Sequence, residues 1–311
     1  MRIVVLDGYA ANPGDIAWDE MKKLGELTVY DRTGADEILS RAKDADAILT
    51  NKCPLTAETL QKLPRLRYVG VLATGYNIVD TNAAKALGIV VTNIPAYSTR
   101  SVAQHVFALI LEIASHVGAH SAAVLGGKWT ASRDFCFWDY PLAEIAGKTL
   151  GIIGNGSIGK TVGKIGEAFD MKVLAYSPSQ CEKSMLDEII ETSDIISLNC
   201  PLKPDNAEMI SKPTLSRMKA GAWLINTARG GLVNEKDVAD ALSSGQLGAY
   251  AADVVTKEPI PGNSPLLTAP NVILTPHIAW APYEARVRLM NIAVDNLKGF
   301  LSGTVLNQVN V

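Results

Sequence analysis

The sequence predicts an α/β protein built around two parallel sheets, because short apolar runs alternate with helical patterns in two separate series. Strands that are apolar throughout and separated by helices are typical of a parallel sheet covered on both faces. A glycine-rich loop opens the second series, and a long helical pattern joins the two. At 311 residues the chain exceeds the usual size of one hydrophobic core, so two domains are expected.

The first series reads as five βα units. We expect its strands at residues 3–6, 27–30, 47–50, 67–72 and 89–93, and its helices at residues 16–24, 35–45, 57–63 and 82–87. A helix over residues 99–120 follows, with Ser98 as a candidate cap, and its length indicates a connector between domains. Residues 126–142 contain an aromatic cluster without periodicity, which predicts an exposed excursion.

The second series has six strands, the count of a complete dinucleotide-binding sheet. We expect these strands at residues 150–154, 172–176, 195–199, 223–227, 250–253 and 272–275, and the helices at residues 158–169, 184–191, 212–219 and 235–244. A last helix over residues 283–301 precedes a short tail, residues 305–311, that should pack on the first domain. The first domain is therefore discontinuous, comprising residues 1–97 and 284–311, and the second comprises residues 98–283.

Composition excludes several classes of protein. A net charge of −3 argues against binding to nucleic acid or to an anionic membrane. No apolar run approaches the roughly 20 residues that span a bilayer. The four cysteines are scattered without a CxxC pair, so neither a zinc site nor a disulfide framework is indicated, and no metal is expected. We expect a cytoplasmic protein.

A GxGxxG loop is the strongest chemical signal in the sequence. It comprises Gly154, Gly156 and Gly159, directly follows an apolar strand and directly opens a helix. Gly154 allows the sharp turn, Gly156 lets the backbone approach a pyrophosphate, and Gly159 permits close packing of helix on strand. The helix N-terminus adds N–H donors and partial positive charge. This context predicts a Rossmann-type dinucleotide-binding domain.

The end of the second strand in this domain bears on the choice of cofactor. An acidic residue is expected there, where it binds the ribose hydroxyls of NAD and excludes the 2′-phosphate of NADP. Ser177 stands in that position, and no Arg follows to attract a phosphate, although Lys183 is nearby. We expect NAD as the cofactor, with NADP not excluded.

Three side chains follow successive strands of the second sheet and are candidates for catalysis. Arg229 follows the fourth strand, where a guanidinium grips a carboxylate through two parallel hydrogen bonds. Glu258 follows the fifth strand and His277 the sixth. An imidazole donates and removes protons near neutral pH, and a carboxylate on its far nitrogen fixes the tautomer and favours the protonated ring. Each residue alone has an ordinary structural explanation; the three together indicate an acid–base site.

These motifs resemble the D-isomer-specific 2-hydroxyacid dehydrogenases over essentially the whole chain. The resemblance rests on the glycine loop, on Leu198 to Leu202, on Ile225 to Gly230, on Asp253 with Glu258, and on Thr275 to Ile278. Within the family the chain is most similar to bacterial glycerate dehydrogenases, also called hydroxypyruvate reductases. That closer likeness rests on residues 72–77, 95–98, 135–142 and 277–280. The resemblance implies that the first domain is a flavodoxin-like substrate domain.

The resemblance also implies roles for particular residues. Arg229 binds the substrate carboxylate, His277 is the acid–base, and Glu258 orients it. The remaining implied contacts are the substrate carboxylate on the backbone of Ala73, Thr74 and Gly75, the pyrophosphate on Ser157 and Ile158, the adenine side on Cys200 and Pro201, and the nicotinamide end on Thr227 and Asp253. Family members are commonly homodimers through the helical region after Pro95. That would give Trp138 a role in the partner's active site, although a local aromatic cluster explains it equally well.

The expected activity is hydride transfer between a nicotinamide cofactor and a small 2-oxo or D-2-hydroxy acid, with hydroxypyruvate and glycerate as the favoured pair. Two alternatives stay open. One is a non-enzymatic, dinucleotide-sensing regulator on the same fold, because fold alone does not fix function. The other is a reductase of a different acid, such as glyoxylate or 2-ketogluconate.

Overall fold

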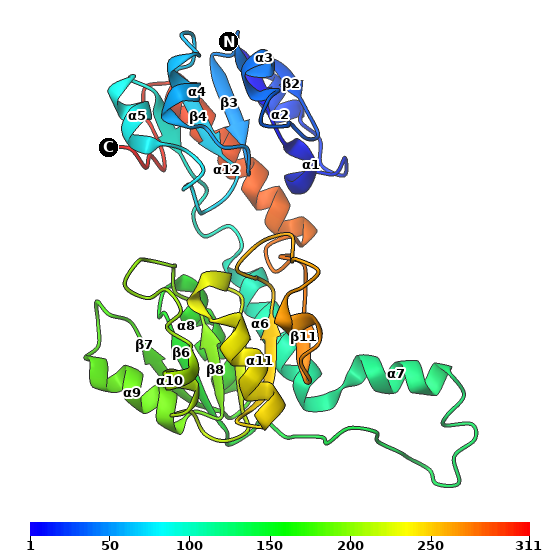
Figure 1. Ribbon diagram of the computed structural model, residues 1–311. Helices are drawn as coiled ribbons and strands as arrows, with labels where there is room; N and C mark the ends of the chain where they lie inside the picture. Colours follow the sequence, from blue (N-terminus) through cyan, green and yellow to red (C-terminus); the bar gives the residue numbers. More distant parts are fainter. The chain divides into compact units, whose positions relative to one another are not determined.

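A computed structural model describes residues 1–311, and these divide into two compact units. Unit 1 comprises Met1–Ser98 and Ala281–Val311 and contains both chain termini, and unit 2 comprises Thr99–Trp280 (Figure 1). The sequence predicted that the chain passes from one domain to the other after residues 97 and 283. Ala281 groups with unit 1 because its carbonyl accepts a hydrogen bond from Arg286 Nε at 2.9 Å, which ties it to the last helix.

Unit 1 is built on a five-stranded parallel sheet in the order β2-β1-β3-β4-β5, which is the flavodoxin-like order. The strands are β1 (Arg2–Val5), β2 (Glu26–Val29), β3 (Ala47–Thr50), β4 (Tyr68–Val71) and β5 (Val90–Thr92). The helices are α1 (Gly8–Ala11), α2 (Asp19–Lys22), α3 (Ile38–Ala42), α4 (Ala57–Gln61), α5 (Thr81–Ala86) and α12 (Tyr283–Leu301).

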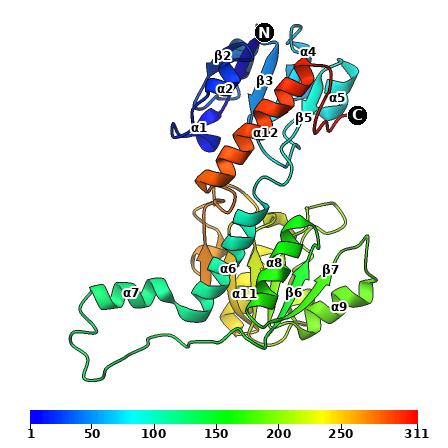
Figure 2. The same ribbon diagram turned by 180° about the vertical axis from the view of Figure 1, so that it is seen from behind.

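Helices cover both faces of this sheet, as apolar strands require. Buried residues of α3, α4 and α5 form one core cluster with the strands. Helix α12 crosses the opposite face (Figures 1 and 2), where Phe300 packs on the buried Tyr68 ring at 5.0 Å between centroids. The prediction that the C-terminal tail packs on this unit is confirmed, because Gln308 forms an antiparallel bridge with Thr92.

Unit 2 contains a six-stranded parallel sheet in the order β11-β10-β9-β8-β6-β7, which confirms the predicted Rossmann-type domain. The strands are β6 (Thr149–Ile153), β7 (Lys172–Tyr176), β8 (Ile195–Leu198), β9 (Ala222–Asn226), β10 (Leu247–Ala252) and β11 (Val272–Leu274). The helices are α6 (Thr99–Ser115), α7 (Val117–Leu125), α8 (Ser157–Ala168), α9 (Lys183–Thr192), α10 (Lys212–Leu215) and α11 (Glu235–Ser244), with short 3-10 turns at η1 (Gly230–Leu232) and η2 (Pro265–Leu267).

The order of the second sheet creates a topological switch point between β6 and β8. From β6 the chain runs outward to β7 and then returns to β8 on the other side of β6. Connections that leave two neighbouring strands in opposite directions open a crevice at the carboxyl ends of those strands. The glycine loop follows β6 directly, so the fold places it at this crevice.

Two core clusters hold this sheet between its helices. Helices α6 and α8 cover one face, seen from the front in Figure 2, and their apolar residues join one cluster with the strands. Helices α9, α10 and α11 cover the other face, seen in Figure 1, and contribute to the second cluster.

The predicted single helix over residues 99–120 is wrong. The backbone of His116 is left-handed, with φ +47°, so α6 ends at Ser115 and α7 begins at Val117. The Glu112 carboxylate accepts hydrogen bonds from the N–H of Gly118 at 3.2 and 3.3 Å and thereby caps the first turn of α7. The two helices meet at an angle of 58°. No single helix is long and apolar enough to cross a membrane. This bent pair has the length and composition of a membrane span only when its two helices are taken together.

Several other helices are shorter than their patterns suggested. Helix α2 begins only at Asp19, and the four-residue α1 before it was not predicted. The predicted start of α3 is instead a turn, in which the N–H of Gly34 donates to Glu37 Oε2 at 2.8 Å. Local side-chain bonds of this kind offer the backbone an alternative to the helix.

Helix α7 and residues 126–142 form an arm that extends from the end of α6 (Figures 1 and 2). Residues 126–142 contain no helix or strand, as predicted. The arm is held together by its own contacts: the N–H of Asp139 donates to His120 Nε2 at 3.1 Å, and Trp129 Nε1 donates to the Phe135 carbonyl at 3.0 Å. No residue of α7 is buried.

We predict that Asn310→Ala destabilises unit 1, because this side chain is the main polar anchor of the tail. It is buried; its Oδ1 accepts from the Val91 N–H at 2.9 Å, and its Nδ2 donates to the Ile89 carbonyl at 2.7 Å. Leaving these two backbone groups unpaired should lower the free energy of unfolding by about 2 kcal/mol in urea denaturation. The matched control is Asn82→Ala, an exposed asparagine, and an equal loss in both variants would contradict the assignment.

Candidate functional site

Arg229 lies on a turn that the sequence folds through a buried asparagine. The turn follows β9, whose last residue, Asn226, is fully buried. The Asn226 side chain accepts from the Ala228 N–H at 3.0 Å and donates to the Arg229 carbonyl at 2.9 Å. Arg229 itself is exposed, and one of its guanidinium nitrogens donates to the Ala228 carbonyl at 2.6 Å. The turn is rigid while most of the guanidinium remains available to a ligand.

Gly230 brings this turn against the loop that follows β10. A Cβ on Gly230 would lie 2.0 Å from the carbonyl carbon of Val255, so only glycine permits this approach. The loop continues to Glu258, whose Oε2 lies 2.7 Å from Nδ1 of His277 after β11. His277 Nε2 has no hydrogen-bond partner. The carboxyl ends of three neighbouring strands thus carry a guanidinium, a carboxylate and an imidazole with one free nitrogen.

Asp253, the residue directly after β10, organises the turn that carries His277. It is 1% exposed, and its oxygens accept from the Thr275 hydroxyl at 2.6 Å and from the N–H groups of Ile278 and Ala279, each at 2.8 Å. His105 Nε2, on α6, lies 2.9 Å from the same Thr275 hydroxyl. The sequence implied that Asp253 contacts the nicotinamide end of a cofactor; in the structure its carboxylate is occupied by the protein.

The glycine loop fits the pyrophosphate of a dinucleotide. Gly154 has φ +105°, and a Cβ there would lie 2.5 Å from the backbone of Asn199 and Cys200 across the switch point. A Cβ on Gly159 would lie 2.0 Å from the Gly154 carbonyl oxygen. Nothing lies within 4 Å of a Cβ on Gly156, so the backbone is open at the position a phosphate must approach.

Other residues around this loop have polar groups suited to a cofactor. Ser157 and Ile158 open α8, and first-turn N–H groups have no acceptor inside a helix. Thr227 Oγ1, after β9, is buried without a hydrogen-bond partner, and so is Asn199 Oδ1, after β8. Buried hydroxyl and carbonyl oxygens are rarely left unpaired, which is consistent with a ligand at these positions.

The remaining predicted cofactor residues lie at the ends of β7 and β8. Ser177 follows β7, and its hydroxyl lies 3.2 Å from that of Ser179. Cys200 and Pro201 follow β8, and the Pro201 carbonyl accepts from Asn206 Nδ2 at 2.9 Å. Burial raises the pKa of the Cys200 thiol, so this side chain acts as an apolar wall and not as a nucleophile. No group of three or more His, Cys, Asp or Glu side chains is arranged to hold a metal ion.

The predicted carboxylate loop, Ala73, Thr74 and Gly75, belongs to unit 1 and follows β4. The Thr74 hydroxyl donates to the Ile94 carbonyl at 2.8 Å, and Asn93 Nδ2 donates to the Thr74 carbonyl at 2.8 Å. These bonds fix the loop, whereas its N–H groups, from Ala73 to Tyr76, make no hydrogen bond within the protein. A run of unpaired N–H groups is an anion-binding feature.

Sequence reasoning missed two residues that build the site. Asn226 braces the Arg229 turn, and His105 supports Thr275 from α6. The signal for His105 was its position on the apolar face of the connector helix, three residues after Val102 and four before Leu109. Nothing in the sequence marks Asn226, because its partners are the backbone of its own turn.

The comparisons with known proteins all point to the same family of enzymes. Residues 107–279 match the NAD binding domain of the D-isomer specific 2-hydroxyacid dehydrogenases. The chain is 51% identical to a hydroxypyruvate reductase of Blautia hydrogenotrophica, covering 100% of both chains. It is 43% identical to a glycerate dehydrogenase of Methylorubrum extorquens, covering 91% of this chain and 92% of the relative. An acyclic imino acid reductase in complex with NADPH and D-Arg superposes with a TM-score of 0.86 at 30% identity, covering 99% and 100% of the two chains.

We predict that Asp253→Asn loosens the turn that carries His277. An amide group in place of one oxygen turns an acceptor into a donor opposite backbone N–H groups, which breaks at least one of the three bonds. Hydrogen exchange of residues 275–280 should accelerate about tenfold or more, while exchange in unit 1 stays unchanged. Unaltered exchange of this turn would show that the carboxylate does not organise it.

Proposed function

The chain belongs to the D-isomer specific 2-hydroxyacid dehydrogenases, and we propose that its substrates are hydroxypyruvate and D-glycerate. The observation that carries this proposal is the Glu258–His277 pair at the strand edge that also bears Arg229. The names of the relatives at 51% and 43% identity support the choice of acid. When bound, a nicotinamide dinucleotide accepts or supplies the hydride. A cytoplasmic location is part of the same proposal.

In this proposal each unit offers one set of donors suited to a substrate carboxylate. Arg229 presents a guanidinium, which matches a carboxylate with two parallel hydrogen bonds and which lysine cannot replace. The N–H groups of Ala73, Thr74 and Gly75 supply further donors. Binding the carboxylate at fixed points orients the neighbouring carbonyl, and such positioning contributes a large part of catalysis.

His277 moves the proton at the reacting oxygen. Glu258 accepts a hydrogen bond from Nδ1, so the Nδ1 proton is fixed and Nε2 is the nitrogen that donates to the substrate oxygen or removes its proton. The Asp253 network holds the turn on which the ring is mounted. In the proposed cofactor site, Gly154, Gly156 and Gly159 shape the loop, and Ser157 and Ile158 bind the pyrophosphate. Ser177 contacts the ribose, Cys200 and Pro201 line the adenine, and Thr227 faces the nicotinamide. Asp253 acts at the nicotinamide end only through the turn that its carboxylate holds.

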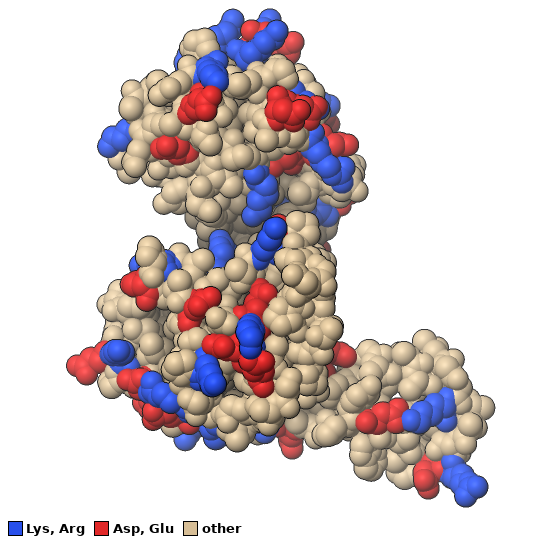
Figure 3. All heavy atoms as spheres, in the orientation of Figure 1, with Lys and Arg blue, Asp and Glu red and all other residues tan.

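We also propose that the protein is a homodimer through the arm. Isolated exposed apolar residues are ordinary, but a contiguous exposed apolar surface marks an interaction site. The exposed apolar side chains of the arm are Val117, Leu125, Trp129, Phe135, Trp138, Tyr140 and Leu142. On the face shown in Figure 3, charged side chains of both signs cover much of unit 2 outside the arm, whereas the arm is mostly uncharged. A second copy of this surface is the partner that fits a symmetric dimer.

We expect the wild-type protein to reduce hydroxypyruvate with a reduced nicotinamide cofactor, and His277→Ala to lower kcat by about a thousandfold because the proton donor is lost. Steady-state rates with hydroxypyruvate, glyoxylate, pyruvate and 2-ketogluconate, each with NADH and NADPH, give the measurement. Cofactor binding measured by fluorescence titration should change little in His277→Ala.

The same panel separates the alternatives. Faster turnover of glyoxylate or 2-ketogluconate than of hydroxypyruvate would reassign the substrate. Cofactor binding without turnover of any acid would favour a dinucleotide-sensing regulator. Unchanged kcat in His277→Ala would refute the acid–base role.

We predict that the double variant Leu125→Glu, Phe135→Glu is monomeric, because two charges would be buried in the arm's contact with its partner. Light scattering after gel filtration measures the mass directly. Leu87→Glu changes a 46% exposed leucine in unit 1, away from the arm, and should leave the dimer intact. A monomeric wild-type protein would overturn the proposal.

A further inference from the structure

Four polar side chains form a row across the carboxyl edge of the unit 2 sheet. Each directly follows the last residue of a strand: Asn199 follows β8, Thr227 follows β9, Asp253 follows β10 and Thr275 follows β11. The registers of these parallel strands place the four residues at one level. The glycine loop follows β6, which neighbours β8, so the row leads from that loop to the turn that carries His277.

The two ends of this row differ in their hydrogen bonds. At the β11 end, the Thr275 hydroxyl donates to Asp253 at 2.6 Å and lies 2.9 Å from His105 Nε2. At the β8 end, Asn199 Oδ1 and Thr227 Oγ1 are buried without a hydrogen-bond partner. Because buried oxygens normally have a partner, these two atoms point to a donor that a ligand supplies.

The orientation of the Asn199 amide is fixed by its own strand. Its Nδ2 donates to the Ser197 carbonyl at 3.1 Å and to the Ser197 hydroxyl at 3.0 Å. A backbone carbonyl only accepts hydrogen bonds, so the NH2 group is on this side of the amide and Oδ1 is on the other side. The Asn199 N–H donates to the Ile153 carbonyl of β6 at 2.7 Å. Oδ1 is therefore a rigid acceptor on the strand beside the glycine loop.

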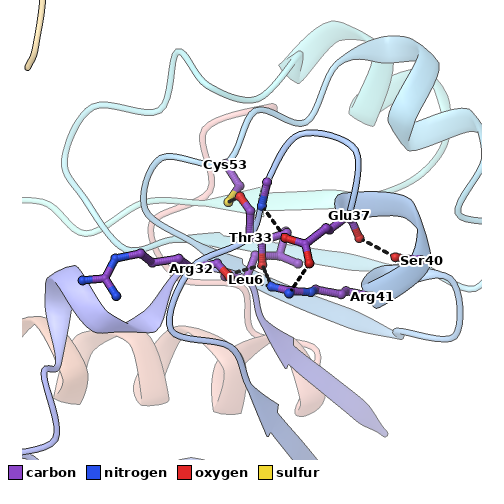
Figure 4. Close-up of polar contacts among 8 residues, drawn as sticks. Leu6, Arg32, Thr33, Glu37, Ser40, Arg41 and Cys53 are labelled. Atoms are coloured by element: carbon purple, nitrogen blue, oxygen red, sulfur yellow. Dashed lines mark hydrogen bonds and ion pairs between the residues drawn. The ribbon is translucent and has the colours of Figure 1, made fainter.

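The corresponding edge of unit 1 has loops of the same kind, with their polar groups paired (Figure 4). There the Thr33 hydroxyl donates to the Leu6 carbonyl, and Cys53 Sγ donates to the Thr33 carbonyl at 3.6 Å. Arg41 donates to the Arg32 carbonyl at 2.5 Å and to the Thr33 hydroxyl at 2.8 Å. No buried side-chain oxygen or nitrogen of unit 1 lacks a partner. Unpaired oxygens are thus not a general property of such an edge.

We propose that Asn199 is a further cofactor-binding residue, whose Oδ1 accepts a hydrogen bond from a hydroxyl of the ribose on the nicotinamide side. This inference rests on the proposed function, in which the glycine loop binds the pyrophosphate. In a nicotinamide dinucleotide, this ribose is the group that joins the pyrophosphate to the ring. Asn199 is on the first strand that separates the glycine loop from the turn of His277.

The chemistry of the two unpaired oxygens favours a ribose over the other parts of the cofactor in this region. An amide oxygen needs a donor, and the ionised oxygens of a pyrophosphate have none, whereas each ribose hydroxyl donates one proton. The Thr227 hydroxyl, on the next strand, is the second group of the same contact. Anchoring the ribose restricts the position of the ring that carries the hydride, so Asn199 contributes to orientation as well as to affinity.

The test measures binding of two cofactor fragments to the wild type and to Asn199→Ala by isothermal titration calorimetry. ADP-ribose contains the ribose in question, and ADP lacks it. We expect the Kd of ADP-ribose to rise about tenfold in the variant, because one hydrogen bond to the ligand is lost, and the Kd of ADP to change less than about twofold. The Kd of NADH, measured by fluorescence titration, should rise as much as that of ADP-ribose.

Two further variants make the result specific. Ser193 Oγ is the third buried oxygen without a partner, but Ser193 precedes β8 at the opposite edge of the sheet and lies against Gly151. Ser193→Ala is therefore the matched control and should leave all three Kd values unchanged. Thr227→Val removes the neighbouring hydroxyl and should weaken ADP-ribose but not ADP. Urea denaturation of each variant shows whether it is folded, because Asn199→Ala also removes the bonds to Ser197.

The other outcomes overturn the assignment in distinct ways. Equal weakening of ADP and ADP-ribose would mean that Asn199 acts on the pyrophosphate or the adenosine. A loss confined to NADH would mean that Oδ1 binds the nicotinamide ring and not the ribose. Unchanged Kd values in both Asn199→Ala and Thr227→Val would show that neither oxygen contacts the cofactor.

These measurements separate this assignment from the proposed function, because they need no turnover. A wild type that binds NADH but reduces no 2-oxo acid would refute the proposed function, and the Kd values would still test Asn199. A wild type that binds none of the three ligands would refute the cofactor site and this assignment together.

Discussion

The carboxylate of Asp253 is the interaction on which the geometry around His277 depends. It is buried, and it accepts from the backbone of the two residues that follow His277 and from the hydroxyl of Thr275 before it. His277 has a left-handed backbone, with φ +57°, a conformation that a residue with a side chain adopts only where its surroundings stabilise it. The three bonds to Asp253 supply that stabilisation. Glu258 holds the imidazole by its Nδ1.

Parallel strands explain why the chemical groups gather at one edge of unit 2. Every loop after a strand emerges at the carboxyl edge, so residues far apart in sequence meet there without further design. Close packing then sets the distances between these loops. Gly230 allows the Arg229 turn to contact the Val255 backbone, and Gly154 allows the glycine loop to contact the loop after β8. At both positions a side chain would push two functional loops apart.

The two units use the same topological feature in different ways. In each sheet the first strand lies between the second and the third, which creates a switch point at its carboxyl end. In unit 2 the chain carries glycines there and leaves backbone open for an anion. In unit 1 the Asp7 carboxylate takes the backbone N–H groups of residues 51–53, so the protein's own charge fills the position. At the switch point of unit 1, these N–H groups are therefore already paired within the protein.

The sequence by itself determined the two parallel sheets, the family and the order of the elements, because apolar runs and the glycine loop are local patterns that buried strands and a tight turn require. Helices α11 and α12 begin and end at the predicted residues for the same reason. Only the tertiary structure decided the break at His116, which depends on the contact of Glu112 with the backbone of Gly118. It also decided the roles of Asp253 and His105. These residues contact partners that are distant in sequence or the backbone of a loop. A periodic pattern of apolar residues carries no information about such contacts.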